Sequence, residues 1–173
     1  MVEKSLGFVV VDIDSTLADT RQRHGKSPHS DPSATWLSYG LLCADDVPII
    51  GTVRTVQMLF QAGHTIHIVT GRGEEVRVLT EKWLIKNGIF FHSLTMRQEH
   101  ESEDHVEYKR SHLLRLKKHE SLPALLAIED WPDVVEMYEA EGVPTLCINP
   151  RYRSDPQAHW DLMAKKKAEA STL

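Results

Sequence analysis

Residues 8–16 read FVVVDIDST, an apolar run that ends in two carboxylates two residues apart. A short run rich in β-branched residues indicates a strand that is buried in a parallel sheet. Asp12 and Asp14 would project to the same side of this strand, because successive strand residues alternate faces. Ligands of open α/β sheets bind just beyond the carboxyl ends of such strands, so the pair indicates an active site. An acidic turn capped by Ser15 or Thr16 is the alternative that this motif alone leaves open.

The carboxylate pair also predicts a type of chemistry. Two acids that converge in this way are costly unless a cation lies between them or one keeps its proton. Mg²⁺ suits such a site, because it prefers oxygen ligands and is usually held by one or two carboxylates together with a substrate phosphate. One carboxylate can act as the nucleophile in phosphoryl transfer while its neighbour transfers protons.

The composition is that of an ordinary globular protein. The 173 residues are 41% hydrophobic and 26% charged, which predicts one domain with a proper core. Cys43 and Cys147 form neither a disulfide framework nor a metal motif, so we expect a cytoplasmic location. The sequence predicts no signal peptide and no membrane span. A net charge of −5 argues against tight nonspecific binding along duplex nucleic acid, but it is compatible with an enzyme that grips one phosphorylated end.

Strand and helix patterns alternate along the rest of the chain. The residue pattern predicts further strands over 64–70, 89–96, 122–128 and 143–148, and helices over 50–62, 74–87, 106–119 and 132–141. The glycines at 71 and 73 are expected to end the second strand. Asp31-Pro32 marks a helix start within the otherwise irregular residues 17–48, and a helix is expected near 158–170. This alternation predicts an α/β fold with a parallel sheet and right-handed crossovers.

Polar residues follow two more of these predicted strands. Thr70-Gly71-Arg72 follows the second strand, and Glu129-Asp130 follows the penultimate one. Taken singly, Thr70 is typical of a turn or a helix cap, and acids before a helix are favourable without any other role. Lys109, between these segments, could neutralise charge on a phosphoryl group or be a solvated helix residue.

The ordered combination resembles the haloacid dehalogenase (HAD) superfamily of phosphotransferases over roughly residues 6–150. The resemblance implies a three-layer Rossmann-like fold, with helices flanking a parallel sheet and no large cap domain. It also implies that Asp12 is the nucleophile, that Asp14 is the general acid/base, and that Thr70 and Lys109 bind the phosphoryl group. The cofactor would be Mg²⁺, and the implied metal ligands are Asp12, Asp14 through its backbone carbonyl, Asp130 and Glu129.

Within that superfamily, the sequence resembles the phosphatase domain of phage polynucleotide kinase/phosphatases. The matching segments are DIDSTLA at 12–18, TGR at 70–72, TEKWL at 80–84, LTMR at 94–97, AIED at 127–130 and VVEM at 134–137. This resemblance implies that Arg23 and Arg72 contact substrate phosphate, and that Asp104 stands where the family also has an acid. Thr16 and Gly71, which belong to the matched motifs, are expected in the substrate site.

The sequence departs from the family pattern at two positions. Residue 15 is Ser where Gly is commoner, and Glu129 replaces the first of two aspartates. The second change should move the outer shell of the metal site without abolishing it. The overall domain is expected over 1–150, with residues 17–48 as a small insertion over the site and 151–173 as a basic, helical tail.

The function that these matches imply is removal of the 3′-phosphate from nucleic-acid ends during repair, through an aspartyl-phosphate. A nucleotidase acting on free nucleoside monophosphates is the alternative enzyme, and a catalytically silent scaffold is the non-enzymatic alternative. No Gly-x-x-x-x-Gly-Lys-Ser/Thr motif occurs, so a polynucleotide kinase or ligase partner would be a separate chain. Trp36 and Tyr39, in the insertion, are the candidates for stacking on a base.

Overall fold

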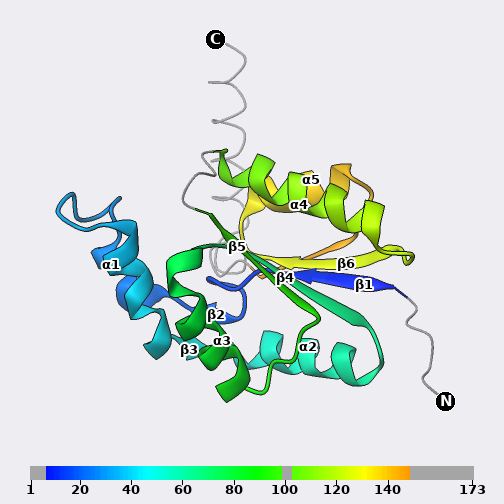
Figure 1. Ribbon diagram of the computed structural model, residues 1–173, viewed down its shortest axis with the longest axis horizontal. Coiled ribbons are helices and arrows are strands. Elements are labelled where there is room, and N and C mark those ends of the chain that lie inside the picture. Colours follow the sequence, from blue (N-terminus) through cyan, green and yellow to red (C-terminus); the bar gives the residue numbers. More distant parts are fainter. Residues whose placement is uncertain (1–6, 99–102, 149–173) are drawn as a thin grey trace, which may run out of the picture.

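A five-stranded parallel sheet forms the centre of the computed structural model, which describes residues 7–98 and 103–148 (Figure 1). The strands lie in the order β5-β4-β1-β6-β7, so β1 is central and the chain reverses direction across the sheet at β1. Ligands of open α/β sheets bind at such a reversal. The strands are β1 (Phe8–Val11), β4 (Thr65–Gly73), β5 (Ser93–Arg97), β6 (Ala124–Glu129) and β7 (Thr145–Cys147).

Helices cover both faces of this sheet, which confirms the predicted α/β fold class (Figure 1). Val9 and Val11 of β1 pack in the cluster that contains Val53 and Trp83, on the side of α2 and α3. Phe8 and Val10 pack on the side of α4 and α5. The first apolar run is continuous because both of its faces are buried. The helices are α2 (Ile50–Gln61), α3 (Arg77–Lys86), α4 (His105–His119) and α5 (Pro132–Ala140).

Residues 17–48 form a small unit at the end of the sheet where the strands terminate (Figure 1). Two short strands, β2 (Ala18–Asp19) and β3 (Val47–Pro48), pair in antiparallel fashion at its base. Between them lie two 3₁₀ helices, over Arg21–Lys26 and Leu41–Asp45, and α1 (Trp36–Gly40). The prediction that a helix begins at Asp31-Pro32 was wrong. The helix begins after Thr35, whose side chain and that of Ser38 cap it reciprocally.

The expected elements occur with changed boundaries. Strand β4 continues through Gly73, which has an extended backbone and pairs with Arg97, so the prediction that the glycines end this strand was wrong. The ladder is nevertheless irregular between Val69 and Gly73. Strand β5 begins at Ser93, four residues later than predicted, and a 3₁₀ turn over Glu74–Val76 precedes α3. The predicted tail helix lies outside the described residues.

The described part of the chain contains no large cap domain above the sheet. None of its helices combines the length and the apolar character needed to cross a bilayer.

Candidate active site

Asp12 leaves the end of β1 and meets a buried lysine. Lys109, on α4, is completely buried, and its Nζ donates to Oδ1 of Asp12 at 2.7 Å and to Oε2 of Glu129 at 2.5 Å. Burial alone would lower the pKa of Lys109, but the two carboxylates raise it above its ordinary value, so the ammonium group stays charged. The lysine therefore ties the end of β1 to the end of β6.

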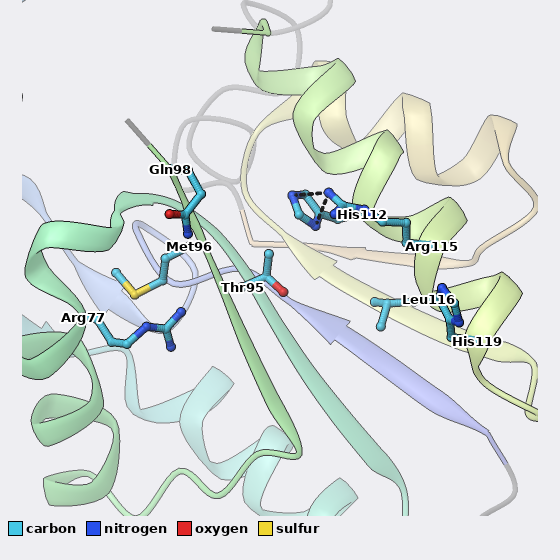
Figure 2. A pocket seen from close by; sticks show the side chains of 8 residues that line it. All are labelled: Arg77, Thr95, Met96, Gln98, His112, Arg115, Leu116 and His119. Carbon is cyan, nitrogen blue, oxygen red and sulfur yellow. Dashed lines mark hydrogen bonds between the residues drawn. The ribbon is translucent and has the colours of Figure 1, made fainter. Parts of the chain in front are cut away.

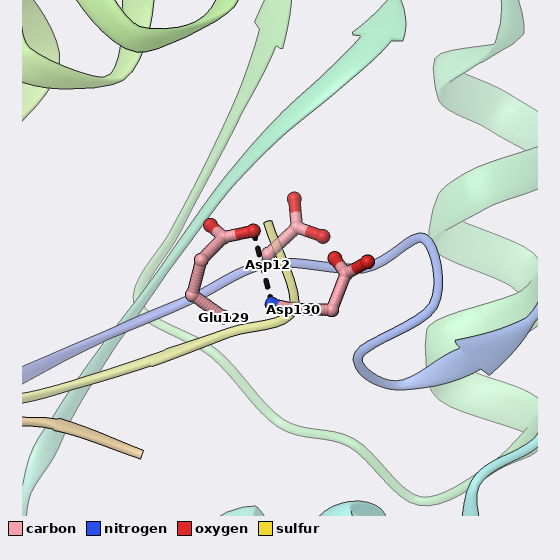
Figure 3. A group of neighbouring side chains, drawn as sticks. All are labelled: Asp12, Glu129 and Asp130. Atoms are coloured by element: carbon pink, nitrogen blue, oxygen red, sulfur yellow. Dashed lines mark hydrogen bonds between the residues drawn. The ribbon is translucent and has the colours of Figure 1, made fainter. Parts of the chain in front are cut away.

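Three carboxylates converge at this point, because β1 and β6 are neighbours in the sheet (Figure 3). Asp12, Glu129 and Asp130 each offer an oxygen, and these oxygens lie within 4.8 Å of one another. Burial raises the pKa of Asp12 to about 7, with Lys109 opposing the shift and Glu129 adding to it. Burial, followed by the charges of Asp12 and Glu129, raises the pKa of Asp130 to about 9. One lysine does not compensate two buried acids and a third that is half-buried, so the cluster favours a bound cation.

The donor set of the cluster fits Mg²⁺, which prefers carboxylate oxygens. Glu129 is already engaged, since its Oε1 accepts the backbone N–H groups of Asp130 at 3.1 Å and Trp131 at 3.2 Å. Thr16 donates its hydroxyl to Oδ1 of Asp130 at 3.3 Å, which orients that carboxylate. Asp12 and Asp130 would therefore hold the metal directly, and Glu129 would orient both through Lys109 and the backbone.

The second acid of the motif has different partners. Oδ1 of Asp14 accepts Nη2 of Arg23 at 2.5 Å and Nη2 and Nε of Arg72 at 2.6 and 3.0 Å. Burial would raise the pKa of Asp14, but the charges of Arg72 and Arg23 lower it below its ordinary value. The side chain of Asp14 thus lies outside the acidic cluster, and a metal contact through its backbone carbonyl stays a prediction.

The other residues expected at the site lie close to it. Thr70 is completely buried, and its hydroxyl accepts the backbone N–H of Arg72 at 3.2 Å. Gly71 is exposed, and the ring of His105 lies beside it. Asp104 is the N-cap of α4, where its carboxylate accepts the N–H groups of residues 106 and 107. A cap at this point fixes the start of the helix that carries Lys109.

Comparison with family models then identifies the family of the domain. Residues 7–151 match the model of the polynucleotide kinase PNKP phosphatase domain, a HAD family. The chain belongs to this family. Membership supports a HAD phosphatase activity for the domain and agrees with the resemblance deduced from the motifs. A comparison with curated proteins finds no match.

Solved structures with the same fold include two of the Pnkp1/Rnl/Hen1 complex, one of them described as an RNA repair complex. They are 20% and 21% identical to the chain and cover 85% and 86% of it, with TM-scores of 0.65 and 0.67. The PNKP-family chain spans only about half of those chains, 47% and 45% of their length. A class C acid phosphatase from Bacillus anthracis with tungstate bound is 16% identical, with a TM-score of 0.59 over 86% of this chain and 69% of its own.

Asp46 is a site residue of this PNKP-family chain that sequence reasoning missed. It is buried just before β3, and its carboxylate accepts Nε and Nη2 of Arg23 at 2.8 and 2.9 Å. It also accepts Nη2 of Arg72 at 2.9 Å. The two arginines are therefore clamped between Asp14 and Asp46, and both are almost fully buried. The only sequence signal was an acidic pair, Asp45-Asp46, at the end of the insertion.

Ser15 adopts a backbone conformation that explains why glycine is commoner at its position. Its φ is +64°, in the left-handed region where a Cβ is unfavourable. The hydroxyl of Ser15 lies at hydrogen-bond distance, 3.0 Å, from that of Thr20. The serine therefore preserves the turn that aims Asp14 at the arginines.

A separate cleft of about 360 Å³ opens between the edge strand β5 and α4 (Figure 2). Four basic or titratable side chains line it: Arg77, His112, Arg115 and His119. None of the acidic cluster lines this cleft, so it is not the place of the chemistry.

Proposed function

We propose that this PNKP-family domain is a Mg²⁺-dependent polynucleotide 3′-phosphatase that acts through an aspartyl-phosphate. The observation that carries the proposal is the convergence of Asp12, Lys109 and Asp130 at the end of β1, in a family of phosphatase domains. The similarity to the Pnkp1/Rnl/Hen1 repair complex supports a repair role in which the phosphatase works together with a kinase or ligase.

The first step is attack by the free oxygen of Asp12 on phosphorus. Oδ1 of Asp12 is held by Lys109, which leaves Oδ2 for the attack. The bond from phosphorus to the sugar 3′-oxygen breaks, and the leaving oxygen takes its proton from Asp14. Asp12 and Asp130 would hold Mg²⁺, which when bound stabilises negative charge on the phosphoryl oxygens. Lys109 and Thr70 face the same end of the sheet and would bind those oxygens.

The second step returns Asp12 to its free form. Asp14 accepts a proton from water, the water oxygen bonds to phosphorus, and the bond from phosphorus to Asp12 breaks to release inorganic phosphate. The lowered pKa of Asp14 keeps this group ionised in the free protein. It can serve as the acid of the first step only if Arg23 and Arg72 turn toward the phosphate dianion and release it. The proposal therefore assigns both arginines to the incoming substrate.

An open site supports a bulky substrate such as a strand end. Residues 7–98 and 103–148 contain no large cap, whereas small-metabolite enzymes more often close a lid over the substrate. A protein that binds along a duplex without sequence preference needs a stripe of basic side chains. An enzyme that binds one phosphorylated terminus does not need such a stripe.

The test is phosphate release with Mg²⁺ from three substrates in parallel. These are an oligonucleotide with a 3′-phosphate, the same oligonucleotide with a 5′-phosphate, and a nucleoside 3′-monophosphate. We expect a strong preference for the first substrate and no turnover of any substrate by Asp12→Asn. A preference for the mononucleotide would instead favour a nucleotidase, and no metal-dependent turnover of any substrate would favour a scaffold.

A further inference from the structure

Two aromatic rings contact each other between the ends of β4 and β6, the strands on either side of β1 and Asp12. His105, the first residue of α4, lies over Gly71, where an added Cβ would meet its ring atoms at 3.4 and 3.5 Å. Trp131 follows directly after Asp130, and its ring centroid is 6.1 Å from that of His105, with the ring planes at 81°. Because β1 lies between β4 and β6, the pair connects the two strand ends that flank Asp12.

The two rings present an uncharged surface beside a strongly charged site. Burial, followed by the charges of Lys109 and Arg97, lowers the pKa of His105 to about 3, so the imidazole is neutral near pH 7. Trp131 is 47% exposed, although the residue on its N-terminal side belongs to the acidic cluster. Its backbone N–H is bonded to Glu129, which fixes where the indole leaves the chain. A neutral, exposed aromatic face suits a base or a sugar rather than a phosphate.

We propose that the His105–Trp131 pair is the platform on which the 3′-terminal base of the strand stacks while its phosphate lies at Asp12. This inference rests on the proposed function and adds a specificity residue, Trp131, and a positioning residue, His105. The ring of His105 lies edge-to-face with the indole, an arrangement that favours this orientation of the indole.

The aromatic residues of the insertion are the competing candidates, and they approach the site through other side chains. Tyr39 lies under the guanidinium of Arg23, at 4.3 Å from the ring centroid. Trp36 packs edge-to-face against His29 and Tyr39, with centroids at 5.1 and 6.0 Å. Trp36 is thus linked to the site through its contact with Tyr39, which in turn contacts Arg23. Trp131, in contrast, directly follows Asp130 of the acidic cluster in the chain. Trp36 is 56% exposed and therefore provides a matched control for the loss of an exposed indole.

The experiment compares two 3′-phosphorylated oligonucleotides that differ only in the last residue, which either carries its base or is a tetrahydrofuran abasic analogue. For the wild-type protein, kcat/KM should be about tenfold higher with the base, the size of one base–aromatic stacking contact. Trp131→Ala should reduce this ratio to about one, and Trp131→Phe should keep most of it. His105→Ala should lower the ratio, and His105→Phe, which keeps a ring against the indole, should restore it. Melting temperatures of all variants verify that they are folded.

Different ratios report on the platform and on the proposed function. A wild-type ratio near one, a tenfold ratio that survives in Trp131→Ala, or a ratio lost in Trp36→Ala but not in Trp131→Ala would each overturn the platform. The proposed function fails if the base-bearing oligonucleotide is no better a substrate than the nucleoside 3′-monophosphate. The two failures are therefore distinguishable in one set of assays.

Discussion

Substituting Asp46 with Asn should damage both the stability and the activity of the domain. The carboxylate of Asp46 accepts four N–H contacts, at 2.8, 3.2 and 2.9 Å from Arg23 and at 2.9 Å from Arg72. An amide keeps one acceptor oxygen and turns an NH₂ group toward two guanidinium groups. Removing one member of a buried ion pair costs about 3–5 kcal/mol. Because the amide retains part of the bonding, we expect about 3 kcal/mol, or a fall in melting temperature of about 6–12 °C for a chain of this size.

The expected effect on activity follows from the same contacts. In Asp46→Asn, Arg23 and Arg72 keep their bonds to Asp14 but lose part of their bonding to residue 46, so their donors lose the fixed geometry needed to receive a phosphate. Losing one such preorganised donor lowers kcat by about 10²–10³-fold, so we expect at least about a 100-fold fall. Asp45→Asn is the matched control, because Asp45 is adjacent and exposed. Thermal melts and steady-state rates of the two variants test the reasoning, which is refuted if Asp46→Asn behaves like Asp45→Asn in both.

Three further predictions concern the metal, a buried imidazole and a strained turn. Mg²⁺ at 100 times its Kd should stabilise the wild type by about 2.7 kcal/mol and so raise its melting temperature. The rise should be lost with EDTA or in Asp130→Ala. An equal rise in Asp130→Ala would contradict the assignment of Asp130 as a metal ligand. His105 is neutral in the folded state down to about pH 3, whereas in the unfolded state it takes up a proton below about pH 6.5. The wild type should therefore lose stability relative to His105→Gln as pH falls below 6.5, by about 2 kcal/mol at pH 5, and parallel pH–stability curves would exclude this. Ser15→Gly should raise the free energy of unfolding by up to about 1 kcal/mol, because it relieves a positive φ, while Ser15→Val should lower it; the reverse order in urea denaturation would show that the turn is not strained.

The acidic cluster could be anticipated from sequence because it follows from strand-end geometry. An apolar run that is buried on both faces must be a central strand, and the acids that follow neighbouring parallel strands must meet at one edge of the sheet. Asp12 and Asp130 come together for this reason. Lys109 was assigned to the site through its match to the family motif, because a lysine on a helix is ordinarily solvated. In the structure this lysine is completely buried. The roles of these residues in catalysis stay predictions.

Asp46, which shares Arg23 and Arg72 with Asp14, could not be anticipated in the same way. Asp46 reaches the site through an irregular segment whose path is set by short 3₁₀ turns and by the pairing of β2 with β3, and such segments have no periodic pattern. The start of α1 was missed because Asp31-Pro32 gave a stronger local signal than the capping pair of Thr35 and Ser38. The sequence therefore predicts the site residues on regular strands and helices better than the site residues in the insertion.

The identity of the nucleophile tests the central claim most directly. The protein is mixed with an oligonucleotide that carries a radiolabelled 3′-phosphate, the reaction is stopped with acid within the first turnover, and the labelled peptide is identified by mass spectrometry. The account predicts label on Asp12, no label on Asp12→Asn, and no phosphate release by that variant. Label on a different residue, or sustained turnover by Asp12→Asn, would contradict it.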